Sequence, residues 1–460
     1  MFSKVKPFIM LSLGLVTALL VGTVSPATAA APVTLTIETF GDVIEPSALI
    51  DYKKLHPEIT IKTKVSSMDA LSGNLITYYQ SHKGPDIAAI ETSYSGLWRS
   101  HPEAFVDLSK APYNANTIKK NYAAWRWSQG TGDGGQVIGI PTDIGGLEVA
   151  YRIDLFKKAG LPTDPKKVAA LWPTWDKFVA TGQKYLKAPA IAKSPKSYKG
   201  FIDSGGTIFN AVLNQGTEKM YNPTTKKPDY KNAQVKRAFL TASSALTAPI
   251  TTKRKGIGAR YQAYTGDWYI GMKNGAYATM LAPAWQLEYI KRYAPTTKNL
   301  WNIAAVPGGG GNIGGSQLTI PKYAQHKQQA WDFISWYLSP HEELKIFRTY
   351  GLFPATDVLF NSSKHCVGTR SPGFTKALTA ADCAAVRNYK DTFFGPKGSG
   401  GAPVGAIYAN GAASLNSIFE GRKERGITQY FNSALGRIEN GQAVGKAYSQ
   451  AVAEITKSKP

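Results

Sequence analysis

The chain has 460 residues, of which 54 are Lys or Arg and 31 are Asp or Glu, so its formal net charge is +23. Such a basic balance is typical of proteins that bind nucleic acid or another anionic polymer. The basic residues are scattered, however, with small clusters only at 252–255 and 422–425, and no nucleic-acid-binding motif accompanies them. We therefore expect no nucleic-acid partner, and two interpretations of the charge stay open: attraction to an anionic cell envelope and an ordinary solvated surface.

The first thirty residues have the pattern of an export signal. Lys4 and Lys6 precede an apolar run from Phe8 to Val24, and small residues with Ala-x-Ala sites follow it. This run is shorter than the ~20 residues of a membrane span, so we expect cleavage near Ala29 to Ala31 and export from the cell. No cysteine lies near the site, so lipid attachment is not indicated.

The length of the mature chain predicts two lobes or more, because about 430 residues exceed what one hydrophobic core normally supports. Cys366 and Cys383 are the only cysteines. In an oxidising compartment such a pair predicts a disulfide, which would stabilise the fold by roughly 3 kcal/mol, and two free thiols are the alternative. No spacing of His and Cys typical of a metal site occurs.

Strand and helix patterns alternate from the start of the mature chain. A period-two strand at 33–38 precedes a helix at 48–55, and a second period-two strand follows at 59–65. A helix at 71–82 then leads to a buried strand at 87–90. Strand, helix, strand is the unit of a sheet covered by helices, so the pattern predicts an α/β fold.

The most informative segment runs from Gly139 to Phe178. An apolar extended piece passes a proline and paired glycines and continues as a second extended run at 147–151. A short helical pattern then stops before Pro162, and Thr174 is a natural N-cap for the next helix.

This layout resembles the first crossover between the lobes of extracellular solute-binding proteins of ABC importers. The resemblance is to the family that captures sugars, sugar-binding family 1, whose members are similar to maltose-binding protein. One departure is Tyr151-Arg152, where the family usually has Tyr-Asn. Further segments that match the family pattern are Leu55-His56-Pro57, Pro85-Asp86 before a buried strand, 268–285, 302–320 and 339–354. The resemblance ends at about residue 357.

The resemblance implies a two-lobed periplasmic-binding-protein-like fold of type II, with each lobe a sheet covered by helices. Crossover segments near residues 144, 306 and 350 would form the hinge. The N-terminal lobe would comprise 31–144 and 306–350, and the C-terminal lobe 145–305 and 351–460. The implied protein is a monomeric, non-catalytic receptor without a cofactor, which captures a small-molecule carbohydrate and delivers it to the membrane permease of an ABC importer.

A sugar offers hydroxyl groups in a fixed array and apolar C–H faces, which carboxylates, amides and aromatic rings can bind. Trp285 is the best candidate for stacking, and Asp143 for accepting hydrogen bonds from sugar hydroxyls. Further candidates that the resemblance places at the cleft are Glu38, Phe40, Gly41, Glu91, Tyr94, Asp267, Trp268, Gly315, Ser316 and Gln317. Asp267 and Trp268 are expected just before a helix, and Trp172, Trp175, Trp331 and Trp336 are expected to pack inside the lobes.

Structural roles are the alternative for each candidate: a core position for Trp285 and Trp268, a turn for Asp143, a salt bridge for Glu38 and a helix cap for Asp267. Enzyme motifs are weak, because the six His are isolated and no Gly-x-Ser-x-Gly occurs. Three other functions stay open: an extracellular polysaccharide-active enzyme, a binding protein for a polyamine, peptide or metal chelate, and an envelope-tethered structural protein.

Overall fold

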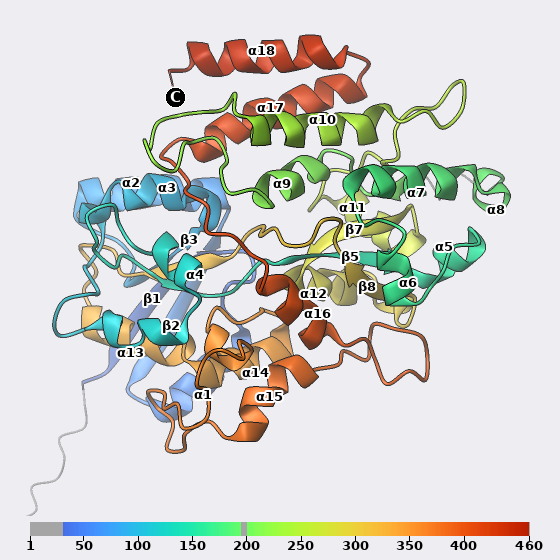
Figure 1. Cartoon of the computed structure of the whole chain (residues 1–460). Helices are drawn as coiled ribbons and strands as arrows, with labels where there is room; N and C mark the ends of the chain where they lie inside the picture. Colours follow the sequence, from blue (N-terminus) through green and yellow to red (C-terminus); the bar gives the residue numbers. More distant parts are fainter. Residues whose placement is uncertain (1–30, 195–199, 460) are drawn as a thin grey trace, which may run out of the picture.

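A computed structural model describes residues 31–194 and 200–459, so the predicted export signal and its cleavage site lie outside the described residues. The strands form two sheets, each covered by helices (Figure 1). We use "first lobe" for the five-stranded sheet with its helices, and "second lobe" for the four-stranded sheet with its helices. The predicted α/β, two-lobed architecture is therefore confirmed.

The first sheet has the order β2-β1-β3-β9-β4. Its strands are β1 (Val33–Phe40), β2 (Ile59–Ser66), β3 (Ile87–Glu91), β4 (Ile140–Pro141) and β9 (Ser316–Thr319). β1 pairs in parallel with β2, from Val33 opposite Ile59 to Phe40 opposite Ser66, and also in parallel with β3. β9 returns from much later in the chain and lies antiparallel between β3 and β4. The first lobe is thus built from two separate stretches of sequence.

The second sheet has the order β6-β7-β5-β8. Its strands are β5 (Leu147–Arg152), β6 (Gly200–Ile202), β7 (Tyr277–Pro283) and β8 (Trp301–Ala305). Every residue of β5 and β7 is buried, because helices cover both faces of this sheet. Burial on both faces explains why β7 is a nearly continuous apolar run.

The α-helices are α1 (Pro46–Leu55), α2 (Met68–Ser81), α3 (Ser95–Arg99), α4 (Ala124–Gln129), α5 (Ile153–Lys158), α6 (Pro165–Ala169), α7 (Trp175–Lys187), α8 (Pro189–Ala192), α9 (Thr207–Asn214), α10 (Ala233–Thr247), α11 (Gly266–Asn274), α12 (Ala284–Tyr293), α13 (Lys327–Tyr337), α14 (Pro340–Tyr350), α15 (Ala380–Asn388), α16 (Val404–Ala412), α17 (Glu424–Glu439) and α18 (Val444–Lys457). Short 3₁₀ turns are η1 (Thr92–Tyr94), η2 (Pro102–Ala104), η3 (Ala115–Thr117), η4 (Lys119–Asn121), η5 (Pro295–Thr297) and η6 (Asp357–Leu359). None of the helices in the described part of the chain has the length and apolarity that crossing a membrane requires.

The segment from Gly139 to Phe178 folds largely as its sequence predicts. β5 and α5 occupy the expected positions, and the Thr174 hydroxyl accepts a hydrogen bond from the Lys177 amide at 3.4 Å, which caps α7. The additional helix α6 lies where only a polar spacer was expected, and Asp164 caps it. Trp172 and Trp175 pack in the core of the second lobe, and Trp331 and Trp336 in that of the first, as expected.

The chain after residue 357 belongs mainly to the second lobe. α17 and α18 lie over α10 and α9 (Figure 1), and the Phe431 ring packs against Phe209 and Phe239 at centroid distances of 5.6 and 5.8 Å. α16 packs beside β5 and β8. The predicted disulfide between Cys366 and Cys383 is present.

Three segments pass between the lobes, at 142–146, 306–315 and 351–354, and backbone hydrogen bonds hold them together. The Ile144 amide donates to the Phe353 carbonyl at 2.8 Å. The Gly145 amide donates to Asn312 Oδ1 at 2.8 Å, and the Ile313 amide donates to the Gly145 carbonyl at 2.8 Å. A Cβ on Gly145 would lie 1.9 Å from the Ile313 carbonyl oxygen, so this approach requires glycine.

Candidate ligand-binding cleft

A cleft of about 720 Å³ lies between the two lobes, and residues from both line it. The first lobe contributes the end of β1, the start of α2 and the turn after β3, and the second lobe contributes α9, the start of α12 and the start of α17. The crossing segments form the floor, with Asp143, Asn312 and Ser316 lining it. A cavity between lobes with a few convergent polar groups is the usual form of a small-molecule site.

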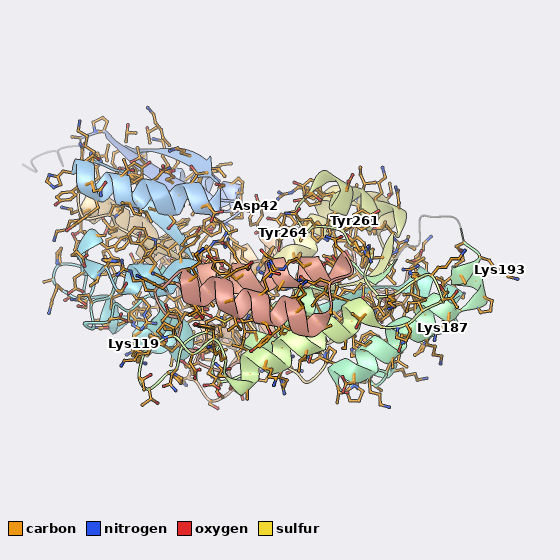
Figure 2. The ribbon with its side chains drawn as sticks, turned by 90° about the horizontal axis from the view of Figure 1, so that it is seen from above. Asp42, Lys119, Lys187, Lys193, Tyr261 and Tyr264 are labelled. Carbon is orange, nitrogen blue, oxygen red and sulfur yellow. A yellow bond between two sulfur atoms is a disulfide. The ribbon has the colours of Figure 1, made fainter. Side chains whose placement is uncertain are left out.

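An aromatic face covers one side of the cleft. Trp285 stands in the first turn of α12 and stacks with Tyr264 at a centroid distance of 6.2 Å and an interplanar angle of 29°. Tyr289, one turn later on α12, meets the Trp285 ring edge-on at 5.7 Å. Tyr264 has φ of +67°, which is rare for an aromatic residue and marks a constrained backbone. Figure 2 shows Tyr264 across the cleft from Asp42.

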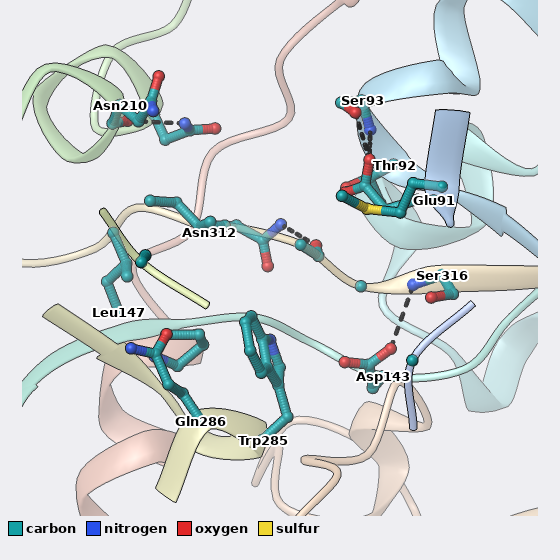
Figure 3. Close-up of a pocket in the computed structure, with 18 of the residues that line it drawn as sticks. Glu91, Thr92, Ser93, Asp143, Leu147, Asn210, Trp285, Gln286, Asn312 and Ser316 are labelled. Carbon is teal, nitrogen blue, oxygen red and sulfur yellow. Dashed lines mark hydrogen bonds between the residues drawn. The ribbon is translucent and has the colours of Figure 1, made fainter. Parts of the chain in front are cut away.

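Asp143 places a carboxylate at the floor of the cleft (Figure 3). Its Oδ1 accepts hydrogen bonds from the Thr142 hydroxyl at 2.6 Å and the Ser316 amide at 3.1 Å. Burial raises the pKa of Asp143 above its ordinary value, although the nearby positive charge of Arg126 opposes the shift. Arg126 is fully buried and donates to the carbonyls of Asp143 at 2.8 Å and Ser316 at 2.6 Å. These bonds fix the position of the floor.

Glu91 ends β3 and lines the cleft from the first lobe. Its carboxylate caps η1 by accepting hydrogen bonds from the Ser93 amide at 2.8 Å and the Thr92 hydroxyl at 3.0 Å (Figure 3). Burial raises the pKa of Glu91 above its ordinary value, and the capping bonds oppose that shift. The group is therefore held rigidly at the boundary of the two lobes.

Seven of the twelve predicted site residues line the cleft, and five do not. The seven are Phe40, Gly41, Glu91, Asp143, Trp285, Gly315 and Ser316. They come from strand ends and crossing segments, which is where the sequence pattern locates the boundary between the lobes. Their contact with a ligand stays a prediction.

Two of the five predicted residues that do not line the cleft, Glu38 and Tyr94, lie in the first lobe near α2. Glu38 is buried, its carboxylate accepts from Ser66 at 2.7 Å and Asn74 at 2.8 Å, and it pairs with Lys64 at 3.0 Å. Burial raises its pKa, but hydrogen bonds from Tyr78 and its other neighbours outweigh that effect and hold the pKa below its ordinary value. The Tyr94 hydroxyl donates to the Asp69 carboxylate. Glu38 therefore has the salt-bridge role that was the alternative, and neither residue lines the cleft.

The other three predicted residues outside the cleft lining are Asp267, Trp268 and Gln317, and each has a place in a helix or a strand. The expectation that Asp267 and Trp268 precede a helix was wrong: α11 begins at Gly266 because Thr265 caps it. Trp268 is fully buried and its indole donates to Asp203 at 2.8 Å, while Asp267 is exposed in the first turn. Gln317 is buried in the central part of the first sheet, where its amide donates to the Ser95 hydroxyl at 3.0 Å. This geometry gives no support to a ligand contact by these three.

Several polar residues that line the cleft were missed by the sequence predictions. Asn312 could have been found, because it follows the glycine run at 308–311 in the predicted second crossing. Asn210 on α9 and Gln286 on α12 lie inside helical patterns, where a polar residue usually marks the solvent face. Glu420 and Glu424 come from the segment without a family match. No group of His, Cys, Asp or Glu suited to a metal ion occurs in residues 31–194 and 200–459.

Comparisons with known proteins agree with this architecture. Residues 48–369 match the model of the bacterial extracellular solute-binding protein family. The arabinooligosaccharide-binding protein of Bacillus subtilis (strain 168) is 24% identical over 331 residues, which are 66% of this chain and 68% of that protein.

Solved structures give the same result for the fold. The crystal structure of an extracellular solute-binding protein family 1 member superimposes with a TM-score of 0.74 at 29% identity and covers 93% of this chain and 100% of its own. The ABC-transporter-associated binding protein of B. animalis subsp. lactis Bl-04, in complex with beta-1,6-galactobiose, has a TM-score of 0.67 at 19% identity and covers 93% of this chain and 98% of its own.

Proposed function

We propose, because the chain belongs to the family of bacterial extracellular solute-binding proteins, that it captures a sugar or an oligosaccharide in the interlobe cleft and delivers it to an ABC importer. The family consists of solute-binding proteins, and we propose no catalytic role for this member. The names of the two sugar-binding relatives support a carbohydrate cargo: one is an arabinooligosaccharide-binding protein and the other was solved with a galactobiose.

The observation that carries the proposal is the pairing of an aromatic face with fixed polar groups in one cleft. The stacked Trp285 and Tyr264 rings offer apolar surface to the C–H face of a sugar, and Asp143 and Asn312 offer oxygen and amide groups to its hydroxyls. Figure 3 shows Trp285, Asp143 and Asn312 around the same cavity.

The mechanism we propose is closure of the lobes around the ligand. The lobes comprise residues 31–144 with 306–350 and residues 145–305 with 351–460, and the three crossing segments act as the hinge. Ligand shifts the population toward the closed form because only that form contacts the ligand from both sides. The closed protein then presents the surface that the membrane permease recognises.

Export and cellular context complete the proposal. A signal peptide is cleaved near Ala29 to Ala31, and the mature protein acts as a monomer. The basic surface attracts the protein to the anionic cell envelope.

A thermal-shift screen against mono- and oligosaccharides tests the function directly. A ligand at 100 times its Kd stabilises the folded state by about 2.7 kcal/mol, which raises the melting temperature measurably. Small-angle scattering with and without the best ligand should then show compaction. If no saccharide stabilises the protein, the carbohydrate assignment fails; if one does but the protein does not compact, the closure mechanism fails.

A further inference from the structure

The cleft is acidic although the chain as a whole is basic. Among the described residues, seven carboxylate side chains line the cleft and only two cationic ones do, whereas the whole chain carries a formal charge of +23. Figure 2 shows Lys119, Lys187 and Lys193 at the periphery of the molecule, away from Asp42 and Tyr264 at the cleft. The sign of the net charge therefore says nothing about the charge that a ligand meets.

Several of the seven carboxylates have a cation of their own. Asp42 pairs with Arg292 at 2.7 Å, and Glu288 pairs with Lys291. The charge of the buried Arg126 acts on Asp143. These pairs leave little negative charge for a ligand to neutralise.

Asp203, a further one of the seven, accepts a hydrogen bond from the Trp268 indole at 2.8 Å, and the other three carboxylates gather where the C-terminal segment meets the first lobe. Glu91 of the first lobe interacts with the charge of Glu420 of the second, and Glu420 with that of Glu424. All three line the cleft, and we call them the acidic cluster. Among the described residues that line the cleft, Lys219 supplies the one amino group: it donates to Glu420 at 2.5 Å and interacts with the charges of the other two. Arg425, the other cation that lines the cleft, is paired with Asp69 at 2.8 Å. The buried Arg126 guanidinium also interacts with the charges of Glu91 and Glu420, so the three carboxyl groups share the Lys219 ammonium and part of the Arg126 charge, which Asp143 also uses.

Two oxygen atoms of the acidic cluster have no hydrogen-bond partner within the described residues. They are Oε2 of Glu420 and Oε2 of Glu424, whose residues are only 6% and 4% exposed and line the cleft. Buried polar atoms in folded proteins are nearly always hydrogen-bonded, and leaving one unpaired is unfavourable. Burial raises the pKa of Glu424 to about 8; the negative charge of Glu420 adds to this shift, and the positive charge of Lys219 opposes it. A donor from outside the chain would satisfy both oxygens.

The chemistry of the missing donor follows from these contacts. An anionic ligand would be repelled, and no described group of residues is suited to a metal ion. A neutral hydroxyl would supply a hydrogen but no charge, whereas an ammonium group supplies three donors and a positive charge. Trp285 and Tyr264, on the cleft wall, offer a ring face to the sugar that carries this group.

We propose that the cleft takes a sugar with a protonated amino group, whose ammonium binds between Glu91, Glu420 and Glu424. This proposal rests on the proposed function and specifies its cargo as an amino sugar or an oligosaccharide that contains one. The aromatic face selects the sugar ring, and the acidic cluster selects the free amine over a hydroxyl or an acetylated amine.

Binding of matched sugar pairs to the full mature protein tests this inference. Glucosamine and its β-1,4-linked disaccharide are compared by calorimetry with glucose and cellobiose, at about pH 7 and constant ionic strength. We expect at least one amino sugar to bind at least tenfold more tightly than its neutral counterpart. We also expect this preference to fall at least fivefold in Glu424→Gln, but not in Glu454→Gln, which makes the same side-chain replacement on α18.

The outcomes separate the two proposals. Equal or tighter binding of the neutral sugars overturns the amino-sugar inference, as does a preference that survives in Glu424→Gln. Binding of neutral oligosaccharides without binding of either amino sugar also overturns it, while the proposed sugar-capture function stands. If no saccharide of any kind binds, both proposals fail. The comparison of ligands on the unmodified protein does not depend on whether the variants fold.

Discussion

Arg425 of α17 and Asp69 of α2 form an ion pair that joins the two lobes beside the cleft. The guanidinium lies 2.8 Å from the Asp69 carboxylate and 4.9 Å above the centroid of the Tyr94 ring, and it donates to the Ser93 hydroxyl at 3.3 Å. Asp69, Ser93 and Tyr94 belong to the first lobe and Arg425 to the second. The contact can form only when the lobes are close, so it favours the closed arrangement.

Removal of this contact should open the ligand-free protein. We expect Arg425→Ala to increase the radius of gyration measured by small-angle scattering and to weaken ligand binding. The pair is partly exposed, so its contribution is no more than about 1 kcal/mol, or about fivefold in Kd. Arg437→Ala is the matched control, because Arg437 lies on the same helix but pairs with Glu454 within the second lobe at 3.4 Å. Equal effects of the two substitutions would contradict the interlobe role.

Loss of the aromatic face should weaken binding of any sugar cargo. We expect Trp285→Ala to raise the Kd of the ligand found in the screen about tenfold or more, since stacking contributes on the order of 1.5 kcal/mol beyond buried area. Trp285→Phe keeps a ring at this position and should retain most of the affinity. Calorimetry provides the measurement. An unchanged Kd in Trp285→Ala would show that this residue does not contact the ligand.

Adjacent glycines in the first crossing segment should respond differently to substitution. A Cβ on Gly145 would lie 1.9 Å from the Ile313 carbonyl oxygen, whereas a Cβ on Gly146 would have only side-chain atoms at 3.8 and 4.0 Å. We expect Gly145→Ala to destabilise the protein by about 2 kcal/mol or more through overpacking, and Gly146→Ala to change stability by less than about 1 kcal/mol. Denaturant titration measures both. Similar stability of the two variants would show that the crossing is not packed this closely.

Stability should depend on pH through Glu148, a residue of β5 that is 4% exposed. Burial raises its pKa from 4.5 to about 8, and its Oε2 accepts a hydrogen bond from the Val306 amide at 3.1 Å. Between these two pH values the folded state holds a proton that the unfolded state has lost, so the free energy of unfolding falls as pH rises. The limiting slope for one such group is about 1.4 kcal/mol per pH unit.

Replacement of Glu148 by glutamine tests this linkage. The melting temperature of Glu148→Gln relative to the unmodified protein should increase steadily as pH is raised from about 5 to about 8. Asp176→Asn, a change at an exposed position of α7, provides the control and should show a constant difference. A difference for Glu148→Gln that does not vary with pH would mean that this carboxyl group ionises normally in the folded protein.

Local patterns predicted most of the first 357 residues, because each element there has its own signal. The alternation at 59–65 became β2, and Thr174 caps α7 as its position before Asp176 predicts. α6 was missed because it has only five residues and carries no apolar periodicity. After residue 357 the chain was expected in the C-terminal lobe, but its fold was left open, since the apolar faces of α15 to α18 do not indicate what covers them.

The contrast between Trp285 and Trp268 shows where sequence reasoning about the site ends. Both were candidates for the cleft, yet Trp285 lines it and Trp268 is buried with its indole bonded to Asp203. Each stands in the first turn of a helix, so local pattern does not separate them. Whether such a Trp lines the cleft or is buried depends on how its helix packs against the rest of the lobe, which only the tertiary structure shows.

The sequence by itself determined the alternation of strands and helices, and it predicted where the chain crosses between lobes and which Trp and Asp stand at the ends of those segments. These features follow from periodicity, capping and turn residues, which act over a few positions. Only the tertiary structure decided that Glu91 lines the same cleft as Glu420 and Glu424, more than 300 positions later in the chain. Their proximity results from packing of the C-terminal segment against the first lobe, and it makes the cleft acidic in a basic protein.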